Sequence, residues 1–506
     1  MRAARGLPPR DVSQDQPAGA SGRESIARNV GFSFVISVIS AVFSTALLIY
    51  LTRELGPEEF GVFALAMSIG SLILLPSNLG IPNATARFMA ELHHDRPAVR
   101  GVVFDALRLK LIVSALFCLV LAALAAPIAD AYDTPELTWP IRIVSLAVFG
   151  QSIVQLYDQI FEAEGRVSVY LRIVSAESAV ETFASIALVA GGLGVSGAMA
   201  GRAGAYLFAA GFGLVLVIRM LGMRGGERAA PQGNVKKILG YGSALLIIDG
   251  AFTLFSRIDV LLIGAILDVT AVGEFEAATR ALTLTAYIGA AVATGVSPRV
   301  AKSEDGPNTA VFERSLAGLM LLQGAFIAPL IIWAEPLTEL VFGSGYEETA
   351  NVLRALAPFA FLMAISPVLA SAVNYLGEAK RRIPLAIGAL AINVVIDLIL
   401  LSKIGIVAGA IGTDVAYLVY VLGHLWICHH LLGTRMKPLA KAFGQAMLAA
   451  AAMAGVLFLF GTGTVAFPLL IIGSILGLAA YAGVLLLTGA VTRAQLRAVV
   501  RRVLPG

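Results

Sequence analysis

Apolar residues gather along this chain into fourteen runs, most of them near twenty residues long, with short polar stretches between them. A helix of about twenty apolar residues spans the roughly 30 Å of hydrocarbon in a bilayer. The runs do not alternate apolar and polar positions, as the strands of a transmembrane barrel would. The pattern therefore predicts an all-α polytopic membrane protein with about 14 transmembrane helices. The predicted spans are 31–52, 60–79, 102–127, 140–161, 171–190, 195–218, 242–267, 272–296, 315–333, 352–374, 384–402, 406–428, 439–460 and 466–488.

The composition supports the same class. Hydrophobic residues make up 58% of the 506 residues and charged residues only 14%, whereas soluble domains carry about 25% charged residues. Both cysteines, Cys118 and Cys428, fall inside apolar runs, so neither a disulfide framework nor a cysteine-based metal site is expected. Two pairs of adjacent histidines at predicted helix ends are interpreted as interfacial polar residues. We expect no metal site and no cofactor, apart from a coupling H⁺ or Na⁺.

Lysine and arginine divide unequally between the predicted loops. If the N-terminus is cytoplasmic, 30 of the 37 Lys and Arg residues, Lys110 among them, fall on the cytoplasmic side, and only Arg53 and Lys403 fall on the other. Basic residues of membrane proteins concentrate in cytoplasmic loops. The bias predicts a multi-pass protein of the cytoplasmic (inner) membrane with both termini in the cytoplasm. It also accounts for the basic pI, so the charge does not indicate a nucleic-acid partner.

Two stretches, 51–66 and 263–278, share a pattern at an offset of 212 residues. At this offset Leu55, Gly61, Phe63 and Ala66 correspond to Leu267, Gly273, Phe275 and Ala278; Arg87 to Arg299; Arg142 to Arg354; and 194–201 to 406–413. The recurring offset predicts two six-helix repeats in the same membrane orientation, followed by two C-terminal helices. Parallel repeats of this kind commonly enclose a substrate site at their interface.

The repeat divides the chain into five expected parts. They are a disordered cytoplasmic tail at 1–24, an N-terminal six-helix bundle at 25–224, a cytoplasmic linker at 225–236, a C-terminal six-helix bundle at 237–433, and two extra transmembrane helices with a basic cytoplasmic tail at 434–506.

Three stretches carry a resemblance to a known family: "LTRELGPEEFGVFALAMSI", "LGIPNATARFMAE" and "FSRIDVLLIGAILDVTAVGEFEAATRAL". They are similar to the polysaccharide-transport (Wzx-type) flippases of the multidrug/oligosaccharidyl-lipid/polysaccharide exporter superfamily, over roughly residues 25–490. The resemblance implies a fourteen-helix, two-bundle fold. It also implies movement of a polyprenyl-pyrophosphate-linked oligosaccharide from the inner to the outer leaflet. The expected partners are this glycan, membrane lipid and polysaccharide polymerases.

Charged residues inside the spans are candidate site residues, because an unpaired charge in hydrocarbon costs several kcal/mol. Arg257 and Asp259 match an Arg-x-Asp pattern of the family, and helix geometry places their side chains about 200° apart. One would face the cavity and the other a neighbouring helix. Arg257 is assigned to the pyrophosphate, because a guanidinium fork suits phosphate oxygens. Arg280 follows Glu276 by one turn and would either pair with it or act as a cavity cation.

Polar side chains recur on the fourth and fifth spans. Gln151, Gln155, Asp158 and Glu162 share one face of the fourth span, and Glu177 and Glu181 share one face of the fifth. Such stripes suit the wall of a hydrated cavity, where they would bind sugar hydroxyls or carry a coupling ion. Gln155, Asp158 and Glu181 are therefore assigned, with Arg257 and Arg280, to substrate binding.

Five charges are assigned to coupling or gating: Arg202, Asp249, Asp259, Asp397 and Asp414. Arg202 and Asp414 correspond at the 212-residue offset, so they would either meet across the central axis as a gate or form separate local pairs. Asp397, one turn after Asn393, would form a proton or sodium site or a structural contact.

Three other functions compete with the flippase. A cation-coupled multidrug exporter of the same superfamily would have a cavity dominated by carboxylates and aromatics, whereas accessible arginines favour the flippase. A peptidoglycan-precursor flippase fits less well, since the first helix carries only Arg28 near the cytoplasm. A membrane glycan polymerase or ligase would need a large outer loop, and the longest here, 130–139 and 334–349, are short. The chain is therefore not expected to be an enzyme.

Overall fold

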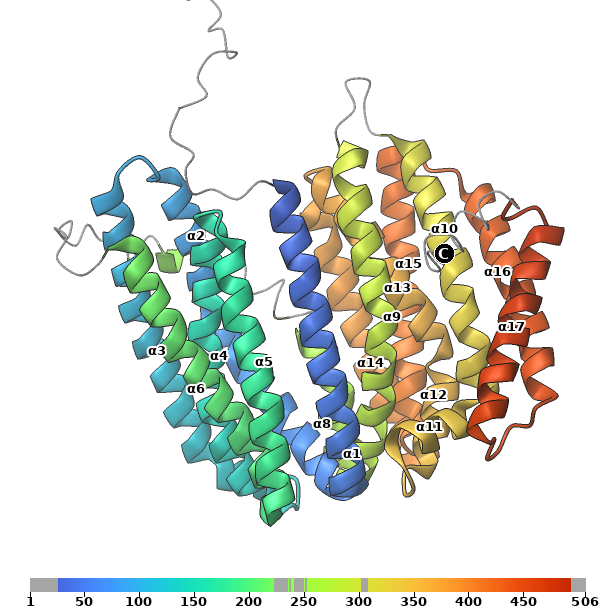
Figure 1. Ribbon diagram of the computed structural model, residues 1–506, viewed down its shortest axis with the longest axis horizontal. Coiled ribbons are helices and arrows are strands. Elements are labelled where there is room, and N and C mark those ends of the chain that lie inside the picture. The colour runs from blue at the N-terminus through green and yellow to red at the C-terminus, as the bar shows by residue number, and fades with distance from the viewer. Residues whose placement is uncertain are drawn as a thin grey trace, which may run out of the picture.

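The computed structural model describes residues 26–222, 235, 238–240, 250, 253–301 and 308–492. Helices are the only regular secondary structure among these residues, so the predicted all-α class is confirmed (Figure 1). The first half of the chain forms α1 (Ile26–Asn78), α2 (Ile81–Glu91), α3 (Arg96–Ala131), α4 (Thr138–Ala163), α5 (Val167–Leu188) and α6 (Gly194–Leu221).

The described part of the second half contains three nine-residue helices, α8, α11 and α12, besides its long ones. Its helices are α8 (Ile258–Ile266), α9 (Val269–Ala301), α10 (Thr309–Ile332), α11 (Ala334–Phe342), α12 (Glu347–Ala355), α13 (Ala357–Tyr375), α14 (Ile383–Ile404) and α15 (Val407–Leu432), and they are followed by α16 (Met436–Phe458) and α17 (Phe467–Leu487). The turns η1 (Pro135–Leu137), η2 (Val189–Leu193) and η3 (Ala379–Arg382) connect some of the helices.

α1 consists of two helices joined at Gly56, whose φ of 70° is available to glycine but strained for other residues. Pro57 follows, and its fixed φ suits the first turn of the second helix. The chain descends to this turn and rises again in Figure 1. We call this end of the molecule the Gly56 end, and the opposite end, where α1 begins, the Ile26 end.

Ten stretches of the described residues are long and apolar enough to cross a membrane. Two of them, Val42–Glu91 and Val167–Leu221, contain chain reversals at Gly56 and at Gly192, where φ is positive. The protein is thus a multi-pass membrane protein. The number fourteen stays a prediction, because part of the span expected at 242–267 lies outside the described residues.

The helices form two bundles, α1–α6 and α8–α15, which meet mainly where α1 packs against α9 (Figure 1). α16 packs against α10, and α17 against α16. The division into two six-helix repeats stays a prediction, because the span expected at 242–267 is described only in part. The expected tail at 1–24 and the linker at 225–236 lie almost wholly outside the described residues, so the predicted domain boundaries stay predictions.

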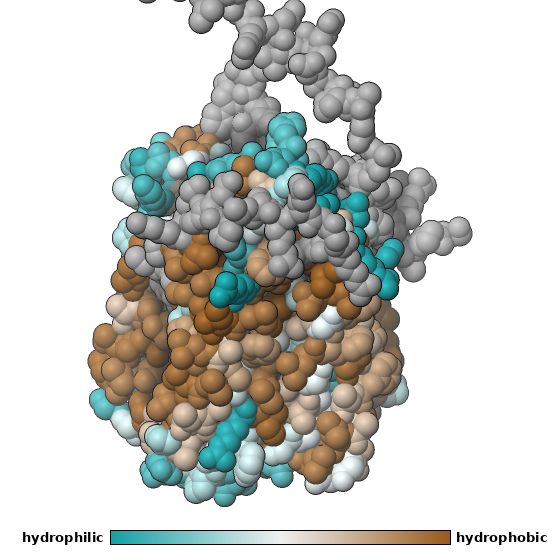
Figure 2. Space-filling view, turned by 90° about the vertical axis from the view of Figure 1, so that its left-hand side faces the viewer, coloured by the Kyte–Doolittle hydropathy of each residue, from teal (hydrophilic) through white to brown (hydrophobic). Residues whose placement is uncertain are grey.

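A broad apolar band covers the face shown in Figure 2, with hydrophilic side chains above and below it. On α3 the exposed side chains include Leu111, Ile112, Leu116 and Leu119. A contiguous apolar surface of this size is unsuited to water. The band is therefore the surface that faces lipid.

Lys110 differs from its expected place as a cytoplasmic charge, because its side chain is fully buried in α3. Its ammonium donates to the carbonyl oxygen of Ser77, at 3.3 Å, and to Oδ1 of Asn78. These residues end α1, where unpaired carbonyls and the negative end of the helix dipole favour a cation. Lys110 therefore caps this helix end inside the first bundle.

Candidate functional site

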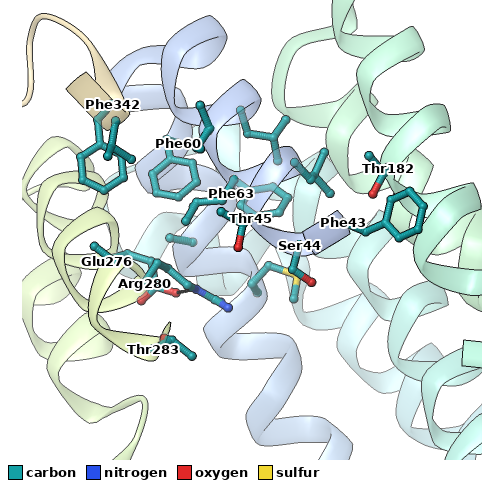
Figure 3. A pocket seen from close by; sticks show the side chains of 18 of the residues that line it. Phe43, Ser44, Thr45, Phe60, Phe63, Thr182, Glu276, Arg280, Thr283 and Phe342 are labelled. Atoms are coloured by element: carbon teal, nitrogen blue, oxygen red, sulfur yellow. Dashed lines mark hydrogen bonds and ion pairs between the residues drawn. The ribbon is translucent and has the colours of Figure 1, made fainter. Parts of the chain in front are cut away.

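A cavity of about 510 Å³ lies between the two bundles, and residues of both line it. Its apolar wall includes Phe60 and Phe63, whose rings stack with centroids 6.0 Å apart, and Phe342. Figure 3 shows these rings gathered on one side of the cavity, away from the polar pair Glu276 and Arg280. The cavity thus combines an aromatic wall with a charged one.

Three arginines from both bundles line the cavity: Arg202 on α6, Arg257 at the turn before α8, and Arg280 on α9. Their side chains are 19%, 23% and 39% exposed respectively, so each guanidinium is partly accessible. Arg257 occupies the N-cap of α8, where unpaired backbone N–H groups add to the positive potential. An anionic group entering the cavity would meet cations on two sides.

Glu276 binds both arginines of the second bundle. Its Oε1 accepts from Nε of Arg280 at 2.7 Å and from Nη1 of Arg257 at 3.4 Å, while Oε2 lies 3.4 Å from the hydroxyl of Thr279. The sequence left open whether Arg280 pairs with Glu276 or acts as a cavity cation. In the structure it pairs with Glu276 and also lines the cavity. In Figure 3 Glu276 and Arg280 project from α9 toward α1.

Arg202 and Asp414 have separate local partners in this conformation, which is the second of the two alternatives that the sequence left open. Nη1 of Arg202 binds Oε1 of Glu181, and Nη2 donates to the hydroxyl of Tyr206 at 3.3 Å. Asp414 instead accepts from the backbone N–H of Phe359, at 2.8 Å. Each charge has a partner within its own bundle: α5 and α6 bring Glu181 to Arg202, and Asp414 caps the N-terminal turn of α13.

The predicted polar stripe on α4 only partly reaches the cavity. Gln151 belongs to the cavity lining, but Gln155 and Asp158 do not. Oε1 of Gln155 accepts from Nδ2 of Asn78 at 2.6 Å, in the network that holds Lys110. Glu181 does line the cavity. The assignment of Gln155 and Asp158 to substrate stays a prediction without support from this cavity.

Asp259 points away from the cavity, as its angular separation from Arg257 predicts. Its Oδ1 accepts from Nδ2 of Asn393 at 2.9 Å, and its Oδ2 from the hydroxyl of Thr413 at 2.7 Å. These residues lie on α14 and α15. One short helix therefore carries a cavity cation at its start and a buried carboxylate on its other side.

Asp397 lies beside Asp259 and is completely buried. Within the described part of the chain, neither oxygen of Asp397 has a hydrogen-bond donor, and neither does Oδ1 of Asn393. Gly412 allows this packing: a Cβ there would overlap Oδ1 of Asp397 and lie 2.9 Å from Nδ2 of Asn393. Two neighbouring buried carboxylates, one of them with both oxygens unsatisfied among the described residues, form a strong candidate for binding a proton or a small cation.

Sequence reasoning missed three features of these sites: the role of Glu276 as a shared partner, Thr413 and Gly412. The four-residue spacing of Glu276 and Arg280 predicted the contact between them, but nothing in the sequence predicted that Glu276 also contacts Arg257. Thr413 lies 154 residues from Asp259, and no local pattern could join them. Asp249 lies outside the described residues, so its assignment stays a prediction.

At the Gly56 end, polar contacts bridge α1 and the second half. Nε of Arg53 donates to the carbonyl of Val341 at 3.1 Å, and the hydroxyl of Tyr346 donates to the carbonyl of Thr52 at 2.9 Å. Burial raises the pKa of Tyr346, which keeps the phenol a neutral donor. These contacts hold the two bundles together beyond the aromatic wall.

Known proteins resemble this chain over most of its length. A Haloferax volcanii protein named "Probable low-salt glycan biosynthesis flippase Agl15" is 24% identical over 488 residues, which cover 94% of this chain and 99% of the relative. The solved structure of a lipid II flippase, MurJ, in an inward closed conformation superposes with a TM-score of 0.74 at 12% identity, over 90% of this chain and 98% of that one. A multidrug transporter of the MATE family, inward-facing, gives a TM-score of 0.66 at 15% identity, over 78% and 95%. The structural matches establish a shared fold.

A sequence profile of one family covers more than half of the chain, from residue 50 to residue 351. The matched region contains both copies of the repeated stretch, the turn at Gly56 and all three cavity arginines. This chain therefore belongs to the polysaccharide biosynthesis protein family.

Proposed function

We propose that this protein is a flippase that moves a polyprenyl-pyrophosphate-linked oligosaccharide across the cytoplasmic membrane by alternating access. The observation that carries the proposal is that both bundles direct arginines into one cavity between them. Planar guanidinium groups bind phosphate oxygens in pairs of parallel hydrogen bonds. The family match and the flippase named among the relatives support the same cargo class.

The charged headgroup and its sugars would occupy the cavity while the polyprenyl chain stays in lipid. With the N-terminus in the cytoplasm, the Gly56 end lies on the outer side. The Arg53–Val341 and Tyr346–Thr52 contacts then close the outer side in this conformation. Separation of these contacts, with closure at the Ile26 end, would release the headgroup outside. Polysaccharide polymerases are expected to use the released lipid-linked glycan.

The buried pair of Asp259 and Asp397 is proposed to couple transport to a proton or a sodium ion. A carboxylate deep in the protein needs a positive partner or a proton, and within the described residues neither forms an ion pair. Asn393 and Thr413 supply further oxygens of the kind that sodium accepts. Because Arg257 precedes Asp259 by two residues, movement of α8 on binding a cation would move the headgroup site.

A multidrug exporter is the second candidate, favoured by the phenylalanines of the cavity wall and by Glu181 and Glu276. Both glutamates are paired with arginines, however. Among the described residues, the second bundle contributes two arginines and one carboxylate to the cavity lining, which is an excess of positive charge. An excess of cations favours an anionic lipid headgroup over the cationic compounds that a carboxylate-rich cavity would suit.

The test is mass spectrometry of lipid-linked glycans in a strain lacking the protein, beside strains complemented with wild type, Arg257→Ala and Arg354→Ala. Loss of the protein should cause a polyprenyl-pyrophosphate oligosaccharide to accumulate. Wild type and the control Arg354→Ala should clear it, because Arg354 pairs with Glu335 outside the cavity. Arg257→Ala should fail to clear the accumulated oligosaccharide, even when the amount of folded protein equals that of wild type. An unchanged lipid pool with new drug sensitivity would favour the exporter.

A further inference from the structure

One carboxylate lies between two guanidinium groups at the charged wall of the cavity. A single oxygen, Oε1 of Glu276, accepts from both Arg257 and Arg280. The Glu276 side chain is only 5% exposed, whereas that of Arg280 is 39% exposed. The carboxylate is therefore more withdrawn from the cavity than the guanidinium of Arg280 that it holds.

The two bundles differ in how they balance their cations. Within the described part of the chain, Glu181 forms an ion pair with Arg202 alone, whereas Arg257 and Arg280 share Glu276. Within the described residues, Arg280 binds Glu276 through its Nε alone. The two Nη groups of Arg280 are therefore available to bind a ligand. So is Nη2 of Arg257, because Arg257 contacts Glu276 through Nη1.

We propose that Glu276 is a built-in competitor of the cargo phosphates: it holds Arg257 and Arg280 together in the empty cavity and yields them when a diphosphate binds. This inference rests on the proposed function, because it concerns the same headgroup site. Without the carboxylate, two neighbouring guanidiniums in a partly dry site would repel each other. With it, they stay positioned for an anion that bridges them.

Competition of this kind has two consequences. A ligand with one phosphate offers too little charge to displace a buried carboxylate from two arginines, whereas a diphosphate can occupy both forks. Glu276 therefore selects diphosphates over monophosphates. It also limits the affinity for the diphosphate, because the displaced carboxylate remains nearby and repels it. Limited affinity lets the cargo leave when the cavity opens to the other side.

The experiment measures binding of farnesyl diphosphate and farnesyl monophosphate to the full-length protein in lipid nanodiscs, with farnesol as the probe for the apolar tail. Wild type should prefer the diphosphate. Glu276→Gln should bind both phosphates roughly tenfold more tightly, because a charged competitor of the ligand is lost. It should also lose part of the preference for the diphosphate over the monophosphate. Its turnover of lipid-linked glycan in cells should fall. Glu274→Gln is the matched control, two residues away on α9 and outside the cavity lining.

Each outcome decides the inference. Weaker or unchanged phosphate binding by folded Glu276→Gln would show a purely structural residue. If that variant does not fold, Glu276→Asp replaces it: a shortened side chain should loosen the hold on the arginines and tighten diphosphate binding, and the opposite result would overturn the inference. If wild type binds neither phosphate and Arg257→Ala and Arg280→Ala change nothing, the headgroup site itself is wrong and Glu276 has no cargo to compete with.

Discussion

Gly61 and Gly273 face each other across the boundary between the two bundles. A Cβ on Gly61 would overlap the carbonyl oxygen of Val269, and a Cβ on Gly273 would overlap that of Pro57; each would lie 3.0 Å from the backbone nitrogen of the opposing glycine. Gly273 follows Gly61, and Val269 follows Pro57, by the same 212 residues. The contact is therefore symmetric under the internal repeat, which explains why both stretches keep a glycine at this place.

Replacing Gly61 with alanine should force α1 and α9 apart at the Gly56 end. The added methyl group collides with backbone on α9, which cannot rotate away as a side chain could. We expect loss of transport and a shift toward conformations open at the Gly56 end. The measurement is labelling of a cysteine at Thr45, a cavity residue, by a membrane-impermeant thiol reagent from each side, with Cys118 and Cys428 replaced.

The matched control for that experiment is Gly204→Ala on α6, where an added Cβ meets nothing within 4 Å. It should leave both transport and labelling unchanged. Wild-type transport by Gly61→Ala, with no gain in labelling from the Gly56 side, would show that close approach of the two glycines is not needed for closure.

Asp397→Asn should abolish stabilisation by the coupling cation. A ligand that binds only the folded protein raises its stability by mass action, so sodium should raise the melting temperature of wild type relative to choline, and lowered pH should do so if the ligand is a proton. The variant should respond to neither, while Asp130→Asn, at the exposed end of α3, should respond as wild type does. Equal responses in all three proteins would remove Asp397 from the coupling site.

Gly412→Ala should impair the same site without touching its ligands. The new methyl group would overlap the Asp397 carboxylate and push it from Asp259. We expect the cation response to weaken while farnesyl diphosphate binding stays close to that of wild type, because Arg257 and Arg280 line the cavity, whereas Gly412, Asp397 and Asp259 do not belong to its lining. A full cation response in Gly412→Ala would mean that the two carboxylates need not pack this closely.

Arg202 and Glu181 should show strong coupling in a double-mutant cycle. Removing one partner of a buried ion pair costs about 3–5 kcal/mol when the other charge is left unpaired, and Arg202→Met would leave Glu181 close to Glu177. The melting temperature of Arg202→Met should therefore be lower than that of Arg202→Met with Glu181→Gln. Purely additive effects in thermal unfolding would show that the pair contributes little to stability.

Much of the helical framework followed from the sequence because it depends on local patterns. The length of apolar runs located α4, α6 and α14 to within a few residues, and the angular rule separated Arg257 from Asp259. α11 and α12 were missed because they are short and lie in a hairpin that was read as a loop. α3 begins six residues before its predicted span, because Asp95 caps it by accepting from the N–H of Ala98.

The partners of the charged residues could not be predicted in the same way. Glu181 and Arg202 meet because α5 and α6 pack as a hairpin, and Asp259 meets Asn393 because α8 packs against α14. Such choices depend on helix packing over long sequence separations. The repeat offset alone could not decide whether Arg202 and Asp414 meet or form separate local pairs. Equivalent positions in two repeats touch when they lie close to the axis, as Gly61 and Gly273 do.

The symmetric contact at Gly61 and Gly273 has the form of an interface in a twofold homodimer, where one surface meets its own copy. In such a dimer every substitution occurs twice, so the two walls of a central cavity must carry the same charges. A single chain that contains both units is free of this rule. It can place an arginine at position 202 and an aspartate at the equivalent position 414. It can also place two arginines beside one glutamate on one wall of the cavity and not on the other. Covalent linkage of the two units thus allows an asymmetric binding site, which a symmetric dimer of identical subunits could not form.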